Sequence, residues 1–311
     1  MPGLAVLINR TAHRFARSHD VLEATAHAAG QEAVVVETHD VAELEAAVRQ
    51  IHHADPDTIA LCGGDGTYMS GLTALSKIYG TNPLPRIALL PGGTVSTVAR
   101  NFGIAGSPAA ALARVVNLHA GGALPTRRHR TLRANDQVGF IFGTALVANF
   151  FEVYYGSEAS GYLDAARIVS RIFAESFVGG PYARRVLEPT ECTVRVDGVA
   201  LSPTHYSLIC CATVRDLGLH MMVSYRAGER DDALHLVASS LPTRKLGPQM
   251  FRVLAGQRLR GEPHYDGLVR EFEVEFPERH AWVLDGDVLR DKIVRVQPGP
   301  AIDVVVGDER R

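Results

Sequence analysis

The chain contains few cysteines, four among its 311 residues, and their spacing is not that of a metal site. Two of them, Cys210 and Cys211, are adjacent, so their side chains would point to opposite faces of a strand. A zinc site and a disulfide framework are therefore not expected, and the free thiols indicate a reducing compartment.

Long apolar runs and a strong excess of charge are also lacking. No run approaches the roughly 18 to 20 residues that a membrane-spanning helix requires. The N-terminus does not show the basic, apolar and small-residue order of a signal peptide. The formal net charge is −2, so the overall field of the chain does not favour contact with nucleic acid. We therefore expect a cytoplasmic protein without a nucleic-acid partner.

The composition that remains is that of a globular protein, with 46% hydrophobic and 21% charged residues. At roughly 150 residues per domain, the length has room for about two domains. The composition shifts around Gly121–Pro125. We therefore expect a first domain over residues 1–124 and a second over residues 125–297.

Strand-like and helical patterns alternate over the first domain, which predicts an α/β fold with a parallel sheet. Asp40 precedes Glu43 at the spacing of a capping box, so a helix is expected to begin there. The expected strands are Leu4–Ile8, Ala33–Val36, Thr58–Cys62 and Ile87–Leu90, and the expected helices are Phe15–Ala29, Val41–Ile51, Ser96–Phe102 and Pro108–Asn117.

Closely spaced strand-like runs with hairpin signals replace this alternation in the second half, which predicts a mostly antiparallel, β-rich domain. Asp197-Gly198 lies between two such runs and is typical of a tight hairpin, because both residue types accept a positive φ angle. The other expected strands are His205–Ala212, Val269–Phe276, Ala281–Leu284, Lys292–Gln297 and Ile302–Val306.

One segment of the second half, Leu163–Val178, has helical periodicity and follows the aromatic residues Phe150, Phe151, Tyr154 and Tyr155. It is either a helix packed on the sheet, or a helix that lines a lipid entrance or rests on a bilayer. The basic run Arg127–Arg130 is similarly either a solvated loop or a contact with an anionic membrane.

The strongest functional signal is the loop Gly63-Gly64-Asp65-Gly66-Thr67, which joins a strand to a helical run. Glycines at such a turn let the backbone approach phosphate oxygens, and the helix N-terminus supplies N–H groups and partial positive charge. A carboxylate among phosphates is repulsive unless it binds a cation or handles a proton. The loop therefore indicates phosphate chemistry, with Asp65 as a candidate catalytic residue.

A second glycine loop, Pro91–Thr94, also follows a strand and precedes a helix that Ser96 or Thr97 could cap. Ligands of an open parallel sheet bind beyond the carboxyl ends of its strands. Both loops are therefore expected to face one nucleotide.

Together these motifs resemble the diacylglycerol kinase and sphingolipid kinase family over nearly the whole chain. That family has Asn-Pro-x-Ser/Ala-Gly after its first strand, then Gly-Gly-Asp-Gly-Thr, then Pro-x-Gly-Thr-x-Asn-x-x-Ala-Arg, and later Asp-Gly-Glu. The corresponding segments here are Asn9–His13, the complete loop Gly63–Thr67, Pro91–Arg100 with Ser96 at the asparagine position, and Asp285-Gly286-Asp287.

The resemblance implies a first domain similar to those of NAD kinases and phosphofructokinases, completed by residues 298–311, and a second domain that holds a lipid. It also implies an ATP site. The matched positions for ATP are Asn9, Thr11, Thr38, Gly63, Gly64, Gly66, Thr67, Gly93 and Thr94.

By the same resemblance, Asp287 stands where the family has the glutamate regarded as the general base. Aspartate is one methylene shorter, so Asp65 and Asp285 remain alternative proton acceptors. On the sequence alone, Asp285–Asp287 would be an ordinary hairpin turn. We expect Asp65→Asn to abolish phosphoryl transfer and to leave the fold intact.

Phosphoryl transfer requires Mg²⁺ to offset the charge of the transferring group. The segment Ala227–Leu234 resembles a family stretch in which an aspartate helps hold a structural Mg²⁺, and Asp231 matches that aspartate. Because Tyr225 and Asp232 depart from the pattern, a solvated acidic turn remains the alternative.

The function implied is an ATP-dependent transfer of phosphate to the hydroxyl of a membrane lipid, either diacylglycerol or ceramide or another sphingolipid. The enzyme would be cytoplasmic and in peripheral contact with the membrane. An NAD kinase-like enzyme is one alternative, although its Asn-Glu pair and Thr-rich dinucleotide segment are not found. An inactive nucleotide-binding regulatory module is another, given Ser96 and Asp287. Exposed sheet edges would be able to pair in a homodimer.

Overall fold

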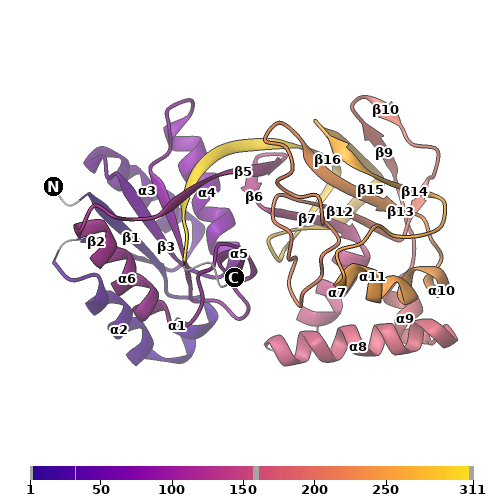
Figure 1. Cartoon of the computed structure of the whole chain (residues 1–311), viewed down its shortest axis with the longest axis horizontal. Coiled ribbons are helices and arrows are strands. Elements are labelled where there is room, and N and C mark those ends of the chain that lie inside the picture. The colour runs from indigo at the N-terminus through magenta and orange to yellow at the C-terminus, as the bar shows by residue number, and fades with distance from the viewer. Residues whose placement is uncertain (1–2, 32, 157–160, 308–311) are drawn as a thin grey trace. The chain divides into compact units, whose positions relative to one another are not determined.

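A computed structural model describes residues 3–31, 33–156 and 161–307 of the chain (Figure 1). The chain divides into two compact units. Unit 1 consists of Met1–Arg130 and Pro300–Arg311, and unit 2 consists of Thr131–Gly299. Two strands, β5 (Thr126–Ala134) and β16 (Asp287–Val305), begin in one unit and end in the other.

The sheet of unit 1 is parallel and has the strand order β4-β3-β1-β2. The central strands β1 and β3 are almost fully buried, as expected for a parallel sheet covered on both faces. The end of β16 joins this sheet, where Val304 pairs in parallel with Ile87 of β4. The strands are β1 (Leu4–Asn9), β2 (Ala33–Thr38), β3 (Thr58–Gly63) and β4 (Arg86–Pro91). The α/β fold predicted for this part of the chain is confirmed.

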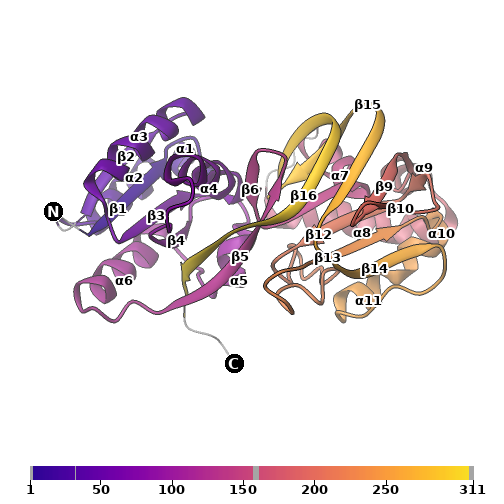
Figure 2. The same cartoon turned by 90° about the horizontal axis from the view of Figure 1, so that it is seen from above.

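Two groups of helices flank this sheet, since α2 contacts α6 and α3 contacts α4 (Figure 2). The helix predicted over Phe15–Ala29 is interrupted at Ser18, whose Oγ accepts the N–H of Val21 and starts a second helix. The helices are α1 (His13–Arg17), α2 (His19–Ala28), α3 (Val41–Ala54), α4 (Asp65–Tyr79), α5 (Thr97–Asn101) and α6 (Pro108–Ala120).

Helix α3 begins where its capping pattern predicted. The Asp40 carboxylate accepts the N–H of Glu43 at 2.8 Å, as an N-cap residue does. The Glu43 carboxylate accepts the N–H of His39 at 2.7 Å, one residue before the partner that a standard capping box would use.

The sheet of unit 2 is antiparallel in the order β14-β13-β12-β7-β15-β16, which confirms the predicted β-rich fold. The expected strands Val269–Phe276 and Ala281–Leu284 prove to be one strand, β15, with a register shift between Glu275 and His280. The remaining strands are β6 (Gln137–Gly139), β7 (Ile141–Ala145), β8 (Thr190–Glu191), β9 (Thr193–Val196), β10 (Val199–Ala200), β11 (His205–Tyr206), β12 (Leu208–Ala212), β13 (Leu234–Ser239), β14 (His264–Val269) and β15 (Phe272–Leu284).

Two hairpins of unit 2 turn on an aspartate–glycine pair in which both residues have positive φ. In the predicted hairpin between β9 and β10, φ is 46° at Asp197 and 84° at Gly198. In the hairpin between β15 and β16, φ is 49° at Asp285 and 92° at Gly286. These are the backbone conformations that tight two-residue hairpins require.

The helices of unit 2 lie together along one side of its sheet (Figure 1). They are α7 (Leu146–Tyr155), α8 (Tyr162–Val178), α9 (Pro181–Val186), α10 (Thr243–Leu246) and α11 (Met250–Leu254), with the 3-10 helix η1 (Gly247–Gln249) before α11. Ile172 of α8 belongs to the same buried cluster as Leu208 and Val237 of the sheet, and α8 contacts α9, α10 and η1. The side of α8 that carries Ile172 therefore contributes to the core of unit 2. Within the described part of the chain, no helix has both the length and the apolarity to cross a membrane.

All four cysteines are buried and free. Burial raises the pKa of the Cys192 and Cys210 thiols to about 12 and also raises the pKa of Cys62 and Cys211. Such thiols stay protonated at neutral pH and are poor nucleophiles. A maleimide reagent should therefore leave the folded protein unmodified while it modifies all four cysteines in denaturant, as measured by intact-protein mass spectrometry. Rapid labelling of the folded protein would contradict this burial.

Candidate functional site

The predicted phosphate loop lies at the point of unit 1 where the strand order reverses. From β1 the chain passes to β2 on one side and later to β3 on the other. In open α/β sheets, ligands bind in the crevice beyond the carboxyl ends of the strands that flank such a reversal. Asn9 ends β1 and Gly63 ends β3, so the two predicted segments meet at this position.

Asn9 connects the two strand ends directly. Its Nδ2–H donates to Oγ1 of Thr67 at 2.9 Å. Its Oδ1 accepts the N–H of Thr11 at 3.0 Å and the Thr11 hydroxyl at 2.7 Å. Three of the predicted ATP-binding residues therefore form one hydrogen-bonded group at the mouth of the crevice.

Helix α4 begins within the loop, at Asp65, and no side chain caps it because its N-cap residue is Gly64. The first N–H groups of a helix have no acceptor inside the helix. Those of Gly66 and Thr67 belong to this first turn. Together with the positive end of the helix dipole, they give the geometry that binds phosphate.

The two glycine loops are bonded to each other. The carbonyl oxygen of Gly63 accepts the N–H of Gly92 at 2.7 Å and that of Gly93 at 3.0 Å. A Cβ atom at Gly93 would lie 2.5 Å from the Cα of Gly64, so the backbones touch where only glycine fits. The N–H groups of Gly92 and Gly93 therefore hold the two loops together. The sequence predicted that both loops face one nucleotide.

The Asp65 carboxylate holds a second helix. Its two oxygens accept the N–H groups of Thr97 at 2.8 Å and Val98 at 2.9 Å, which are the first turn of α5. The predicted cap at Ser96 or Thr97 is wrong, because Ser96 has φ of 51° and its side chain caps nothing. Asp65, which lies 32 positions before Thr97 in the chain, caps α5 instead.

Two neighbours of this anchor are buried. Ser96 is only 3% exposed and lies in the left-handed backbone region, where asparagine is more common than serine. This preference gives a backbone reason for the asparagine in the resembling family's motif. The Tyr68 hydroxyl donates to the carbonyl of Leu90 at 2.9 Å, and burial, with the nearby charge of Asp65, raises its pKa. Tyr68 therefore stays a neutral donor.

The other matched positions of unit 1 differ in accessibility. Thr94 is half-buried, directly after the second loop. Thr38 pairs with Asn9 in the sheet but is 3% exposed, and its hydroxyl lies 3.5 Å from the carbonyl of Ile8. Arg14 was not among the predicted site residues. Its backbone N–H donates to the carbonyl of Gly92, in the second glycine loop, at 3.0 Å. No spacing or motif in the sequence singles out this arginine.

The two remaining candidate bases lie in unit 2 and differ sharply from each other. Asp285 is 3% exposed, and its carboxylate accepts the N–H groups of Phe140 and Ile141 at 2.8–3.1 Å. The carboxylate of Asp287, two residues on, makes no hydrogen bond or ion pair with the described residues. Burial raises the pKa of Asp287. Asp285 therefore anchors the hairpin, and Asp287 is the carboxylate with the features of a proton acceptor.

Asp231, the predicted metal ligand, lies exposed in a turn rich in ion pairs, including Arg226 with Glu229 and Arg230 with Asp232. Across residues 3–31, 33–156 and 161–307, no three histidine, cysteine, aspartate or glutamate side chains converge to hold a metal ion. The assignment of Asp231 as a metal ligand therefore stays a prediction.

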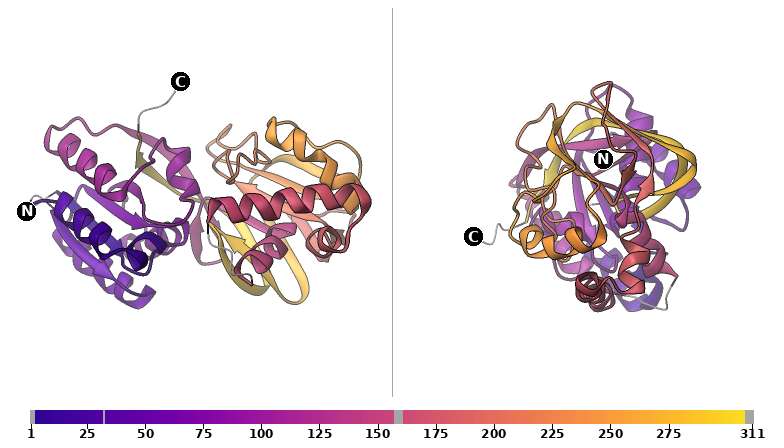
Figure 3. Two further views of the ribbon diagram at one scale, coloured as in Figure 1. Left: turned by 90° about the horizontal axis from the view of Figure 1, so that it is seen from below. Right: turned by 90° about the vertical axis from the view of Figure 1, so that its right-hand side faces the viewer.

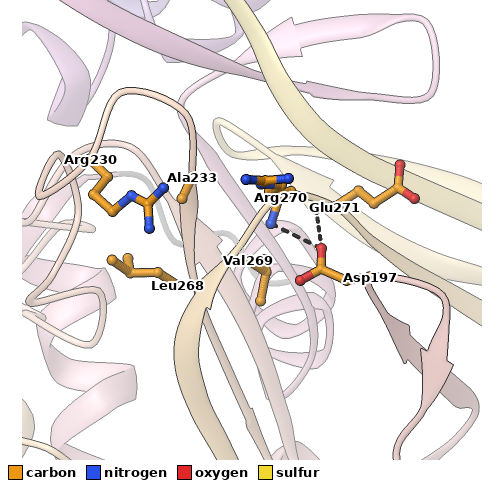
Figure 4. Close-up of a pocket in the computed structure, with 7 residues that line it drawn as sticks. All are labelled: Asp197, Arg230, Ala233, Leu268, Val269, Arg270 and Glu271. Atoms are coloured by element: carbon orange, nitrogen blue, oxygen red, sulfur yellow. Dashed lines mark hydrogen bonds between the residues drawn. The ribbon is translucent and has the colours of Figure 1, made fainter.

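A pocket of about 610 Å³ lies beside the β9–β10 hairpin (Figure 4). The Asp197 carboxylate faces it but accepts the N–H groups of Arg270 and Glu271 at 3.1 and 3.0 Å. The lining residues are Asp197, Arg230, Ala233, Leu268, Val269, Arg270 and Glu271. None of the predicted site residues is among them.

Comparison with known proteins shows what this chain is similar to. Residues 3–123 match the model of the diacylglycerol kinase catalytic domain. The resemblance seen in the sequence motifs is therefore confirmed for this segment. A search of curated protein sequences gave no match.

Solved structures show the same fold over the whole chain. A diacylglycerol kinase from Bacillus anthracis str. Sterne has 15% sequence identity and a TM-score of 0.63, and the match covers 98% of this chain and 97% of that chain. A candidate diacylglycerol kinase from the same strain has 14% identity and a TM-score of 0.70, with the same coverage of 98% and 97%. At these identities the likeness shows the fold.

The anchoring role of Asp65 changes the outcome expected for Asp65→Asn. The amide NH₂ would face the N–H of Thr97 or Val98, so we now expect a loss of about 1–3 kcal/mol in the free energy of unfolding, measured by urea denaturation. Asp20→Asn is the control, since Asp20 lies in the first turn of α2 and acts there only through the helix dipole. Equal stability of the two variants would contradict the anchor.

The anchoring role of Asp285 predicts a larger loss for Asp285→Ala. This change removes the acceptor of two backbone N–H groups, each costing about 1–3 kcal/mol when left unpaired, so the free energy of unfolding should fall by about 2–5 kcal/mol. Asp136→Ala is the matched control, because Asp136 is exposed in the neighbouring β5–β6 turn. Thermal unfolding of the three proteins measures the effect, and a midpoint unchanged in Asp285→Ala would refute it.

Proposed function

We propose that this chain, whose residues 3–123 match the model of the diacylglycerol kinase catalytic domain, is an ATP-dependent lipid kinase. It would transfer the γ-phosphate of ATP to the hydroxyl of a membrane lipid, either diacylglycerol or ceramide or a sphingoid base. The observation that carries the proposal is the uncapped N-terminus of α4 at the strand-order reversal of unit 1, joined through Asn9 to the end of β1.

The nucleotide phosphates would bind at this crevice. The N–H groups of Gly66 and Thr67 point out of the helix start, and the Thr11 hydroxyl lies at the neighbouring strand end. Because Asp65 is held by α5, the start of α4 cannot shift without breaking two charge-assisted hydrogen bonds. The site is therefore rigid before the nucleotide arrives, which lowers the entropy cost of orienting it.

The family implies a divalent metal ion. Mg²⁺ usually keeps several waters and is held by one or two carboxylates together with substrate phosphates. A site without three convergent protein ligands among the described residues fits this pattern, with Asp65 as the carboxylate of the loop. When bound, the ion would offset the charge of the phosphate oxygens.

Asp287 would take the proton of the lipid hydroxyl as its oxygen attacks the γ-phosphorus and ADP leaves. Its carboxylate has no partner among the described residues, and burial raises its pKa above that of an ordinary aspartate. A base with a raised pKa has a stronger affinity for the transferred proton. Only the ionised form can act, so activity is lost as the pH falls through this raised pKa.

The test is transfer of labelled phosphate from γ-labelled ATP and Mg²⁺ to detergent-dispersed diacylglycerol, ceramide and sphingosine, with NAD as a soluble acceptor. Asp287→Asn should lower kcat by about 10²–10⁴-fold, the usual contribution of a general base. Asp287→Glu, which restores a carboxylate, should recover part of that loss. Asp136→Asn should behave as the wild type.

The pH profile separates a base from a structural residue. In the wild type, log kcat/KM should rise with a slope of one as the pH passes through the pKa of Asp287, and this limb should disappear in Asp287→Asn. Label found only in NAD would refute the lipid acceptor. A full limb retained in Asp287→Asn would refute Asp287 as the base.

A further inference from the structure

Helices α8 and α11 expose large apolar side chains at one end of unit 2. Val178 is 73% exposed, Phe251 is 67% exposed and Phe177 is 53% exposed. Single exposed apolar residues are ordinary, but contiguous ones mark an interaction surface. Figure 3 shows α8 running across the outer side of unit 2 in its left view.

These residues form one patch. The ring of Phe173 meets the ring of Phe177 at 5.0 Å and that of Phe251 at 5.3 Å, both edge to face. Leu254 follows Phe251 by three positions and is also exposed. We name Phe173, Phe177, Val178, Phe251 and Leu254 the apolar tip. Since Ile168 and Ile172 of α8 pack in the core, α8 uses one face for folding and leaves the tip outside.

The apolar tip is bordered by cationic side chains. The segment Thr243–Arg260, which contains α10 and α11, has five arginine and lysine residues and no aspartate or glutamate. At Gly179, which ends α8, guanidinium nitrogens of Arg184 and Arg244 lie 3.1–3.4 Å from the position that a Cβ atom would take. The basic border therefore begins directly after Val178.

Most of this positive charge is not neutralised by the protein. Arg184, Arg185, Arg244 and Lys245 are exposed, and within the described residues none of them has an ion pair or a side-chain hydrogen bond. The nearest acidic residue of α8, Glu175, is bonded to Arg171 and to two backbone N–H groups, which lowers its pKa. The border thus presents unpaired cations around an apolar centre.

We propose that the apolar tip inserts into an anionic lipid surface while its arginine and lysine border binds the headgroups. This rests on the proposed function in one respect, since it brings the kinase to its lipid acceptor. An apolar face with basic flanks is the pattern of proteins that lie in the membrane interface. A second copy of the chain fits less well, because a symmetric contact would bring two basic borders together.

Two arginines of the basic run Arg127–Arg130 contact other residues of the protein. Arg128 is paired with Asp303 at 3.2 Å, and the guanidinium of Arg127 lies over the ring of Phe102 at 5.2 Å. The membrane contact is therefore reassigned from Arg127–Arg130 to the apolar tip and its border.

The test is co-sedimentation of the full chain with vesicles of phosphatidylcholine alone or of phosphatidylcholine with phosphatidylglycerol. The wild type should bind only the anionic vesicles, and added salt should weaken binding by screening. The doubles Phe177→Ser with Phe251→Ser and Arg185→Glu with Lys245→Glu should each lower the affinity by about tenfold or more. The controls Val199→Ser and Lys292→Glu, at exposed positions of other hairpins, should leave it unchanged.

Wild-type affinity in both doubles would overturn the proposal, as would absence of binding to the anionic vesicles. A dimer in sizing chromatography that these substitutions convert to a monomer, without vesicle binding, would assign the tip to a second copy instead. Phosphate transfer to detergent-dispersed lipid is measured on the same variants and should be unchanged. Vesicle binding without transfer would refute the proposed function alone, and transfer without vesicle binding would refute the docking surface alone.

Discussion

The Asp65 carboxylate is the contact on which the candidate site depends. It lies at the start of α4 and accepts two N–H groups of the first turn of α5, those of Thr97 and Val98, so one side chain fixes the relative position of two helices. The Gly63 carbonyl adds two backbone bonds between the same loops. Charge-assisted bonds of this kind are roughly twice as strong as neutral ones. The relative position of the two loops is therefore fixed by contacts within the protein.

In the Asp-Gly-Asp turn of unit 2, an aspartate side chain likewise accepts hydrogen bonds from backbone N–H groups. Asp285 is buried as an anchor for the backbone of β7 and the residue before it, whereas the half-buried Asp287 carboxylate is not used in this way. In both motifs one acidic residue has its oxygens committed to backbone N–H groups. Asp287 lacks such partners among the described residues, and burial raises its pKa. The two aspartates of this turn therefore differ in their contacts.

Much of the fold was predictable because local patterns decided it. The alternation of strands and helices predicted the α/β fold of unit 1. The Asp197-Gly198 pair predicted the hairpin between β9 and β10 in unit 2. What escaped prediction depends on contacts between distant residues. A cap supplied to α5 by Asp65 across 32 positions leaves no trace in local spacing. The merging of two expected strands into β15 likewise depends on pairing with β16. The division at Ser18, in contrast, comes from a local cap that the helical periodicity alone does not indicate. The motifs were sufficient to locate the candidate site residues. The hydrogen bonds of the structure were needed to distinguish the contacts that each residue makes.

The return of β16 to the sheet of unit 1 has a consequence for synthesis on the ribosome. Strand β4 pairs with Val304, near the end of the chain, so the sheet is incomplete while the whole of unit 2 is being translated. During that interval the open edge of β4 can attract other strands. A chaperone bound to the nascent chain would protect this edge until Val304 pairs with β4.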